Sequence, residues 1–338
     1  DPSEFAIREK RLRKSLMNLS QRFETLRKRL TVGPAYGVMI LLFLAVLFWG
    51  IFKIITPENF GSKSALVNYF LSSIIYSVGG CGLFFIVVMG MFDFSIGANV
   101  ILSSIVGVIA STYFGYPGLL IGCIACGTLI GFLNGFLYIK LRIPSMIVTV
   151  GLMLIFESTA YFVAGGKKQT LDTALRAFGK APASLILAIF AFLLMNFILR
   201  NTKIGTYCYA IGSNEYITKN MGINVDKFKL IGFVLTHFFV GIMAVLTVSY
   251  GWSMTAITGM ESMGRNFTPL MGTFLGLAFR KYGIPVLAII IGEFIISIIF
   301  NGFIAIGAPT TIQNVVTGAA LLIIVTLTAR PEKGAVVK

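Results

Sequence analysis

Four ionisable side chains lie inside strongly apolar stretches of this sequence, where they are candidates for chemistry. They are Asp93, Glu157, His237 and Glu293. A charged group at the centre of a bilayer costs about 3 kcal/mol or more unless it is paired or hydrated. The lone histidine has no second ligand at helical spacing, so we expect no metal site. The sequence does not place two of the four together as an acid–base pair, and for Glu157, His237 and Glu293 we expect hydrogen bonds between helices.

Asp93 lies in the most unusual of these stretches. Gly90 to Asn99 reads GMFDFSIGAN, so glycines bracket a Phe-Asp-Phe-Ser core that leads into an apolar helix. This pattern favours a capped helix start within membrane depth, and a discontinuous helix near residues 90–97 is tolerated only where it lines a cavity or is buried. Asp93 is therefore either a structural cap or part of a substrate path. To that path we assign the polar groups within apolar spans and two flanking rings: Phe92, Asp93, Phe94, Ser95, Asn134, Thr149 and Asn301.

The elements that position these groups are transmembrane helices. Of 338 residues, 57% are hydrophobic and only 12% are charged, which is about half the charged fraction of soluble domains. Apolar runs of about twenty residues recur, the length that crosses the hydrocarbon core as a helix. We therefore predict an all-α polytopic membrane protein with about ten transmembrane helices. The expected spans are 36–55, 67–89, 96–112, 117–137, 145–164, 184–200, 230–250, 267–279, 285–303 and 311–328.

The basic residues orient these spans. Ten crossings put both termini on one side, and about three-quarters of the 28 Lys and Arg residues then fall there. The positive-inside rule makes that side the cytoplasm. Topology thus explains the net charge of +15, and we expect no nucleic-acid partner. Residues 1–33 are predicted to form a basic amphipathic helix on the cytoplasmic lipid surface, with docking onto a cytosolic partner or a short coiled coil as alternatives; 34–328 form the transmembrane domain and 329–338 a cytoplasmic tail.

Two further patterns concern packing. Gly127, Gly131 and Gly135 repeat every four residues, which gives one helix a small-residue face that another backbone can approach closely. Cys123 and Cys126 form a CxxC within an apolar helix and have no histidine nearby. We expect these thiols to pack against neighbouring helices rather than bind a metal.

One long polar segment interrupts the apolar spans. Gly205 to Leu230 reads GTYCYAIGSNEYITKNMGINVDKFKL, and its density of Asn, Lys, Tyr and Gly places it in water on the cytoplasmic side. The chain contains no GxxxxGKS or GxxxxGKT loop to hold the phosphates of ATP. It also has no GxSxG, HExxH or GxGxxG motif in a supporting context, so we assign no catalytic residues. A structured polar loop without a nucleotide site of its own favours movement by an external motor that docks there.

With this topology the chain resembles the membrane permease subunits of bacterial ATP-binding-cassette (ABC) importers, in the ribose/simple-sugar (branched-chain-type) branch. Four patches over about residues 65–328 carry the likeness. Gly90–Gly97 is similar to the family's GGIDLSVG, and Asn134–Gly166 is similar to NG…KLxIPxFIVTLGTMxIFxG…GG. Gly205–Leu230, the most specific patch, is similar to GxYxYAIGGNEEAAxxxGINVDxxKL. The last patch comprises Asn301, Gly302, Gly307, Gln313, Val316 and Gly318.

The resemblance implies that residues 200–229 are a coupling segment, whose short helix presses into a cleft of a cytosolic ABC ATPase. Carried over by position, that contact is formed or bounded by Gly212, Ser213, Asn214, Glu215, Asn220 and Gly222. A helix that starts near Ser213–Asn214 has good capping residues and an acidic first turn. The family also implies a periplasmic or extracellular solute-binding protein, a second permease subunit in a homo- or heterodimer, and the bacterial cytoplasmic (inner) membrane. The chain would be no enzyme and bind no cofactor itself, since ATP and Mg²⁺ belong to the ATPase.

The sequence departs from the family at two places. Met91 stands where relatives carry a second glycine, which predicts a less tight bend, and Ser262–Gly283 replaces an ELDAIAAVVLGGTSLxGG-like run that helps form the pore in relatives. The expected function is the transmembrane subunit of an ATP-driven importer for a small polar solute, with a sugar as the first choice and a nucleoside or another small metabolite as alternatives. From other classes, an ion-coupled secondary carrier and a non-transporting membrane scaffold remain open.

Overall fold

The computed structural model describes residues 33–309, 311–312, 315, 318–319 and 322–323. The amphipathic helix expected at 1–33 and the tail expected at 329–338 lie outside the described residues, apart from Gly33, as does much of the span expected at 311–328. Over the described part the chain is helical, and its strand-like pairing there is a single bridge between Gln169 and Met254.

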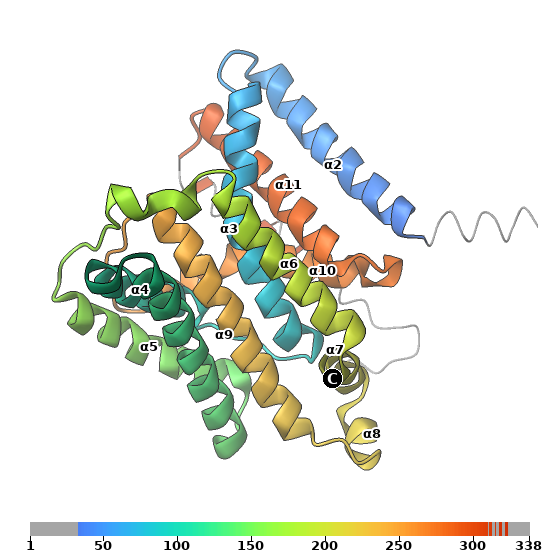
Figure 1. Ribbon diagram of the computed structural model, residues 1–338. Coiled ribbons are helices and arrows are strands. Elements are labelled where there is room, and N and C mark those ends of the chain that lie inside the picture. The colour runs from blue at the N-terminus through green and yellow to red at the C-terminus, as the bar shows by residue number, and fades with distance from the viewer. Residues whose placement is uncertain (1–32, 310, 313–314, 316–317, 320–321, 324–338) are drawn as a thin grey trace, which may run out of the picture.

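The described helices follow one another with short connections (Figure 1). They are α2 (Pro34–Ile55), α3 (Lys63–Val88), α4 (Ile96–Leu141), α5 (Ser145–Ala164), η1 (Thr173–Gly179), α6 (Ala183–Asn201), α7 (Lys203–Ser213), α8 (Glu215–Asn220), α9 (Val225–Ser249), η2 (Glu261–Asn266), α10 (Phe267–Ala278), η3 (Phe279–Tyr282) and α11 (Pro285–Ala305). Seven of them are long and apolar enough to cross a membrane: α2, α3, α4, α5, α6, α9 and α11. The prediction of an all-α polytopic membrane protein is confirmed.

Helix α4 contains two of the predicted spans. Its 46 residues bend back on themselves at Gly115, whose φ of 60° is left-handed and suits a residue without a Cβ. Pro117 follows the bend. The two arms pack closely, since a Cβ built on Gly122 would lie 3.0 Å from the Cα of Gly107. α4 is therefore a helical hairpin that supplies two crossings, as the spans expected at 96–112 and 117–137 require.

Helix α10 is shorter than a membrane span. It has 12 residues, a length of about 18 Å at the helical rise, against roughly 30 Å of hydrocarbon. The span expected at 267–279 therefore exists as a helix but does not cross by itself. It is packed against α3 and α11, which provide the surrounding apolar surface.

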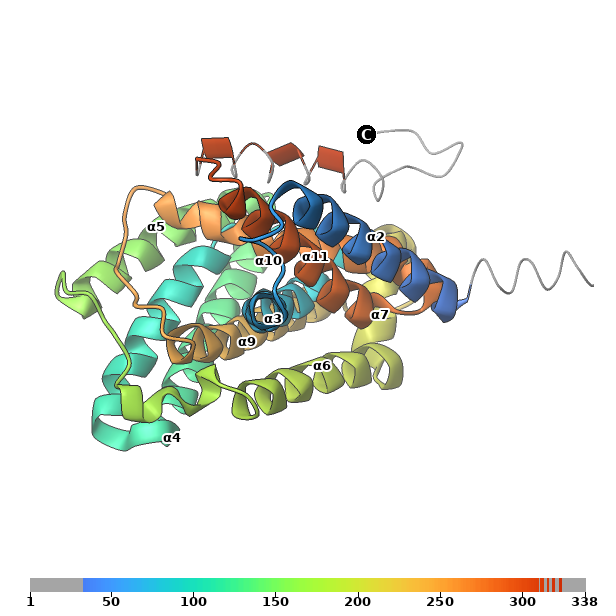
Figure 2. The same cartoon turned by 90° about the horizontal axis from the view of Figure 1, so that it is seen from above.

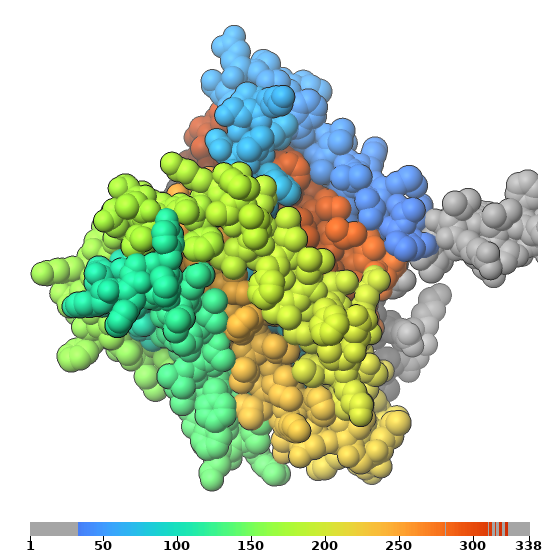
Figure 3. All heavy atoms as spheres, viewed as in Figure 1, coloured from blue at the N-terminus to red at the C-terminus, as the bar shows by residue number. Residues whose placement is uncertain are grey.

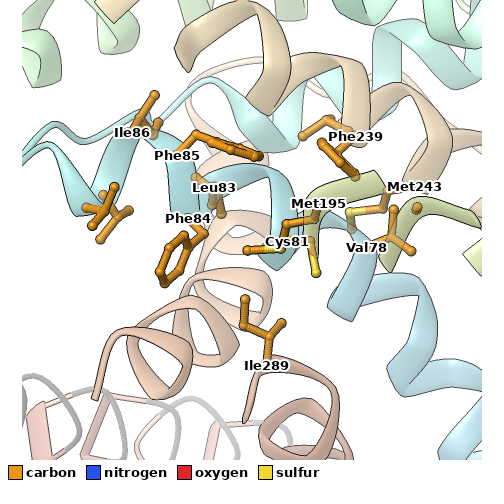
Figure 4. Close-up of a cluster of buried hydrophobic side chains, with 14 of the residues drawn as sticks. Val78, Cys81, Leu83, Phe84, Phe85, Ile86, Met195, Phe239, Met243 and Ile289 are labelled. Atoms are coloured by element: carbon orange, nitrogen blue, oxygen red, sulfur yellow. The ribbon is translucent and has the colours of Figure 1, made fainter. Parts of the chain in front are cut away.

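Helix α3 lies at the centre of the molecule. It is buried over 83% of its most apolar stretch, against 78% for α9 and 17% for α2. Figure 2 views α3 end-on among its neighbours α9, α10 and α11. In the core, Phe85 of α3 stacks on Phe239 of α9, and Met195 of α6 and Ile289 of α11 belong to the same buried cluster (Figure 4). The second half of α3, from Ser77 to Val88, is buried without interruption, as expected of a helical segment that other helices cover on all sides.

Peripheral helices carry the apolar surface that faces outward. Phe190 and Leu193 of α6 are 55% and 63% exposed, and Phe43 of α2 is 67% exposed. Figure 3 shows α6 and α4 on either side of α9, which remains visible between them. In water such a surface would be unfavourable, whereas lipid chains cover it without cost.

The small-residue face formed by Gly127, Gly131 and Gly135 packs α4 against α9. Cβ atoms built on Gly127 and Gly131 would lie 2.7 Å from the carbonyl oxygens of His237 and Phe233 respectively. The expected small-residue packing face is therefore present, and α9 is its partner.

We predict that Gly131→Val destabilises the protein by about 3 kcal/mol or more, because the new side chain meets α9 backbone that cannot turn aside. Gly151→Val on α5 is the matched control, since nothing lies within 4 Å of a Cβ built there. The thermal unfolding temperature in detergent should fall for Gly131→Val and stay unchanged for Gly151→Val. Equal losses in both variants would contradict close packing of α4 on α9.

Candidate functional site

The chain breaks its helical course between α3 and α4, at the place expected from Gly90–Asn99. The C-terminus of α3 is closed by two backbone bonds, from Gly90 N–H to the Val87 oxygen (3.0 Å) and from Met91 N–H to the Ile86 oxygen (3.0 Å). Gly90 has a φ of +80°, so this is a Schellman motif, in which an apolar residue is favoured after the glycine. Met91, only 4% exposed, fills that position. The substitution of the family's second glycine is thus accommodated, and the predicted loosening of the bend is not seen.

Helix α5 holds the break from one side. The backbone N–H of Phe92 donates to Ser145 Oγ (3.1 Å), and that of Phe94 donates to Thr149 Oγ1 (3.0 Å). These two acceptors lie one turn apart on the same face of α5. Thr149 therefore serves as a hydrogen-bond partner of the non-helical backbone, which has lost its partners within a helix. The rings of Phe92 and Phe94 stack with centroids 6.4 Å apart.

Asn266 holds the break from the other side. Its Oδ1 accepts from Gly97 N–H (2.5 Å) in the first turn of α4, and its Nδ2 donates to the Phe94 oxygen (2.6 Å). Asn266 is 2% exposed. It provides the cap that we had expected from Asp93. Sequence reasoning missed this residue because it lies 169 positions away from the helix it caps.

Asp93 is the centre of a buried polar cluster instead. Its Oδ1 accepts from both the N–H and the Oγ of Ser95 (2.7 Å each), and its Oδ2 accepts from Asn134 Nδ2 (2.9 Å) and His237 Nε2 (2.7 Å). The side chains of Asp93 and His237 are both 0% exposed. The structure thus pairs an acid in the break between α3 and α4 with a base on α9, which the sequence does not place together. His237 makes the interhelical hydrogen bond expected of it.

Two further side chains extend the cluster along α4. Asn99 Nδ2 lies 2.5 Å from His237 Nδ1, and Ser103 Oγ donates to Asn99 Oδ1 (2.5 Å). With its proton on Nε2, the imidazole donates to Asp93 Oδ2 and accepts from Asn99 through Nδ1, while Asn134 Nδ2 lies 3.0 Å from the same Nε2. Both residues are 0% exposed. The cluster therefore satisfies almost all of its own donors and acceptors, with Asn134 Oδ1 as its one unpartnered side-chain atom among the described residues.

The seven residues assigned to the substrate path do not form one group. Six of them surround the break between α3 and α4. Asn301 lies on α11, where its Nδ2 donates to the Ser297 oxygen (2.8 Å), and it lines a separate cavity with Tyr76 and Trp252. Glu157 is also occupied elsewhere, because its two carboxylate oxygens accept from the N–H groups of Met260 and Ser262 at the start of η2 (2.9 Å each).

The polar segment after α6 folds into two short helices. α7 ends at Ser213, and Asn214 caps α8 by accepting from Ile217 N–H (3.0 Å). The helix start expected near Ser213–Asn214 is therefore present, with Glu215 in the first turn. Asn220 is the last residue of α8, and Gly222, with a φ of +82°, makes the turn toward α9.

One buried lysine ties α8 to the membrane helices. Lys229 Nζ of α9 lies 2.8 Å from Glu215 Oε1 and donates to the hydroxyl of Tyr138 on α4 (3.2 Å). Its side chain is 9% exposed, against 53% for Glu215. α7 is anchored separately, since Gly212 packs directly on the carbonyl oxygen of Val88, at the end of α3.

We predict that Lys229→Met loosens α8 without unfolding the membrane helices. An ion pair of this exposure is worth about 1 kcal/mol or less, so amide exchange in α8 should rise by up to about fivefold. Lys219→Met, which removes an exposed lysine in the same helix, should leave exchange unchanged. Identical amide exchange rates of α8 in Lys229→Met and in the native chain would show that the ion pair between Glu215 and Lys229 does not anchor α8.

Comparison with known proteins places the chain among permeases. A family model described as "Branched-chain amino acid transport system / permease component" matches residues 65–325. The L-arabinose transport system permease protein AraH of Escherichia coli K12 is 28% identical over 307 residues, covering 86% of this chain and 89% of that protein. The ribose import permease protein RbsC of the same strain is 25% identical, covering 79% and 86%. The autoinducer 2 import system permease protein LsrC of Enterobacter sp. 638 is 27% identical, covering 70% and 75%. No solved structure gives a significant match.

Proposed function

The chain belongs to the branched-chain amino acid transport system permease family, and from this premise we propose that it is the transmembrane subunit of an ATP-driven sugar importer. It would work in the bacterial inner membrane with both termini in the cytoplasm. A cytosolic ABC ATPase, with its ATP and Mg²⁺, would supply the energy. A solute-binding protein outside and a second permease subunit, identical or not, would complete the assembly.

The exposed surface of α8 carries this proposal. Tyr216 is 75% exposed and Ile217 54% exposed, and Met221 directly after the helix is 74% exposed. Large apolar side chains on a water-facing helix mark a surface that another protein covers. The Asn214 cap and the ion pair between Glu215 and Lys229 hold this surface in a fixed orientation. Such a helix suits a cleft on the ATPase.

The contacts of α7 suggest how movement would reach the path. Gly212 lies against Val88, the last residue of α3, and the helical break follows immediately. A displacement of α7 would therefore be passed to the break and to the Asp93 cluster. Tightly packed helices transmit small shifts as rigid bodies. The ATPase would alternate access to the path by this route.

The relatives favour a sugar as the solute. The names of the proteins described above refer to L-arabinose, ribose and autoinducer 2. We propose a monosaccharide for this chain, and a nucleoside or another small metabolite is the alternative.

One observation supports a second functional class, the ion-coupled secondary carrier. The buried contact between Asp93 and His237 is the kind of acid–base pair that an ion-coupled carrier uses to take up and release protons. In such a carrier, uptake would follow the proton gradient and would need no ATPase.

Uptake into vesicles decides between these functions. The chain would be reconstituted with its ATPase, binding protein and second permease, and supplied with labelled pentoses, hexoses, nucleosides and leucine. We expect accumulation of one sugar that requires internal ATP and resists proton ionophores. Accumulation that ionophores abolish, or that proceeds without the ATPase, would refute the importer.

A further inference from the structure

A cavity of about 380 Å³, lined by apolar and polar side chains, lies among the helices away from the break. Its walls come from the first half of α3, the second half of α11, the start of α10 and the chain just after α9. This is the end of the molecule opposite α8 (Figure 1). If α8 faces the cytoplasm, the cavity belongs to the outer half of the membrane. Its volume falls at the small end of the roughly 300–1,000 Å³ typical of ligand pockets.

Glu293 supplies an unused acceptor to this cavity. The residue is 1% exposed, and its Oε1 accepts from Gly272 N–H of α10 (3.0 Å). Its Oε2 is buried and has no hydrogen-bond partner. A buried acceptor without a partner costs about 1–3 kcal/mol. The expected interhelical bond therefore accounts for only one of the two carboxyl oxygens.

The other polar groups of the cavity wall also have acceptor capacity left. Ser72 and Ser297 both donate their hydroxyl protons to the backbone oxygen of Tyr69 (3.0 Å each). Asn301 donates its Nδ2 to the backbone oxygen of Ser297 (2.8 Å) and to the Ser297 hydroxyl (3.4 Å), and that hydroxyl also lies 3.4 Å from the Ser72 hydroxyl. A hydroxyl whose proton is used still offers its lone pairs. These groups, together with Glu293 Oε2, suit a ligand that brings several O–H donors.

Aromatic rings form another part of the wall. Tyr76 and Trp252 lie with centroids 5.9 Å apart, and Trp252 and Tyr250 with centroids 5.5 Å apart. Flat apolar faces beside a few well-placed polar groups are the usual composition of a small-molecule site. The C–H face of a sugar ring can lie on such a ring while its hydroxyls point toward the acceptors.

We propose that this outer cavity binds the transported solute, a neutral polyhydroxylated molecule of monosaccharide size, with Glu293 Oε2 accepting from its hydroxyls and Trp252 covering one face. The inference rests on the proposed function and adds to it the place and chemistry of the solute. The solute is then recognised in the cavity between α3 and α11. The Asp93 cluster, whose polar groups hydrogen-bond to one another, instead stabilises the break between α3 and α4.

Tryptophan fluorescence tests binding without the ATPase. The sequence contains two tryptophans, Trp49 and Trp252, so Trp49→Phe leaves Trp252 as the sole reporter. The full chain in lipid nanodiscs would be titrated with neutral aldopentoses and aldohexoses, and with choline as a cationic comparison. We expect one sugar to change the Trp252 emission. Glu293→Gln, which keeps the acceptor for Gly272, should raise its Kd by about 10- to 100-fold.

The matched control is Glu58→Gln, which makes the same substitution at an exposed position in the α2–α3 connection. It should leave Kd unchanged. An unchanged Kd in Glu293→Gln, or a response to choline in place of sugars, would overturn this site.

Transport in the complete assembly separates this inference from the proposed function. ATP-driven sugar uptake with the same KM in Glu293→Gln and the native chain would leave the importer standing and refute the cavity. Failure of the native assembly to take up any sugar would refute the function itself.

Discussion

Asp93→Ala is expected to abolish uptake and to lower the stability of the folded chain by about 3–5 kcal/mol, the usual cost of removing one partner of a buried charged or hydrogen-bonded pair. The carboxylate accepts from Ser95, Asn134 and His237. Without it, four buried donors from these three residues lose an acceptor. The break between α3 and α4 would then lose its fixed shape.

Two further variants make this result specific. Asp93→Asn keeps the shape and one acceptor oxygen, so we expect a smaller loss of stability than in the alanine variant. Asp172→Ala removes an exposed aspartate that caps η1, which should cost about 1 kcal/mol and leave uptake intact. Thermal unfolding and uptake would be measured in all three. Normal uptake by a folded Asp93→Ala protein would mean that the cluster has no part in transport.

The double substitution Asn214→Ala/Glu215→Ala is expected to reduce ATP-dependent uptake by at least tenfold while the membrane helices stay folded. Asn214 caps α8, and Glu215 holds it to Lys229. A helix of six residues has little stability of its own. Loss of a cap that contributes about 1 kcal/mol is therefore enough to unfold much of α8. A movement of the ATPase would then deform the unfolded α8 segment and would no longer displace α7.

The chain offers a close control for this variant. Asn224 caps α9 with the same geometry, accepting from Lys227 N–H at 3.0 Å. α9 has 25 residues and is anchored by packing along most of its length, so Asn224→Ala should retain most of the uptake. If the double variant transports as well as the native chain, energy does not enter through α8, and an ion-coupled carrier becomes the better explanation.

Local patterns were sufficient for much of the fold. Apolar runs located the helices, and Gly90 marked the place where the chain breaks between α3 and α4. The Asn214 cap was likewise visible, because a helix start depends on residues within three positions. The short α10 was mistaken for a full span, since hydropathy alone does not reveal that α3 and α11 cover it.

The contents of the candidate sites could not be predicted in the same way. Asp93 and His237 are 144 positions apart, and Asn266 reaches the break from 169 positions away. Such contacts follow from how helices pack, which a single sequence does not specify. Glu293 was correctly expected to bond another helix, but its second, unused oxygen and the aromatic wall beside it became evident only in three dimensions.

Labelling of residue 216 from each side of the membrane tests the central claim most directly, namely that a cytosolic ATPase drives this chain through α8. Tyr216→Cys would be made in a Cys126→Ser background, because the other three thiols are buried and burial raises the pKa of the Cys208 thiol to about 12. We predict that an impermeant maleimide labels Cys at this position in inside-out vesicles but not in intact cells, and that the bound ATPase blocks the reaction. Labelling in intact cells, or labelling that the ATPase leaves unchanged, would contradict the account.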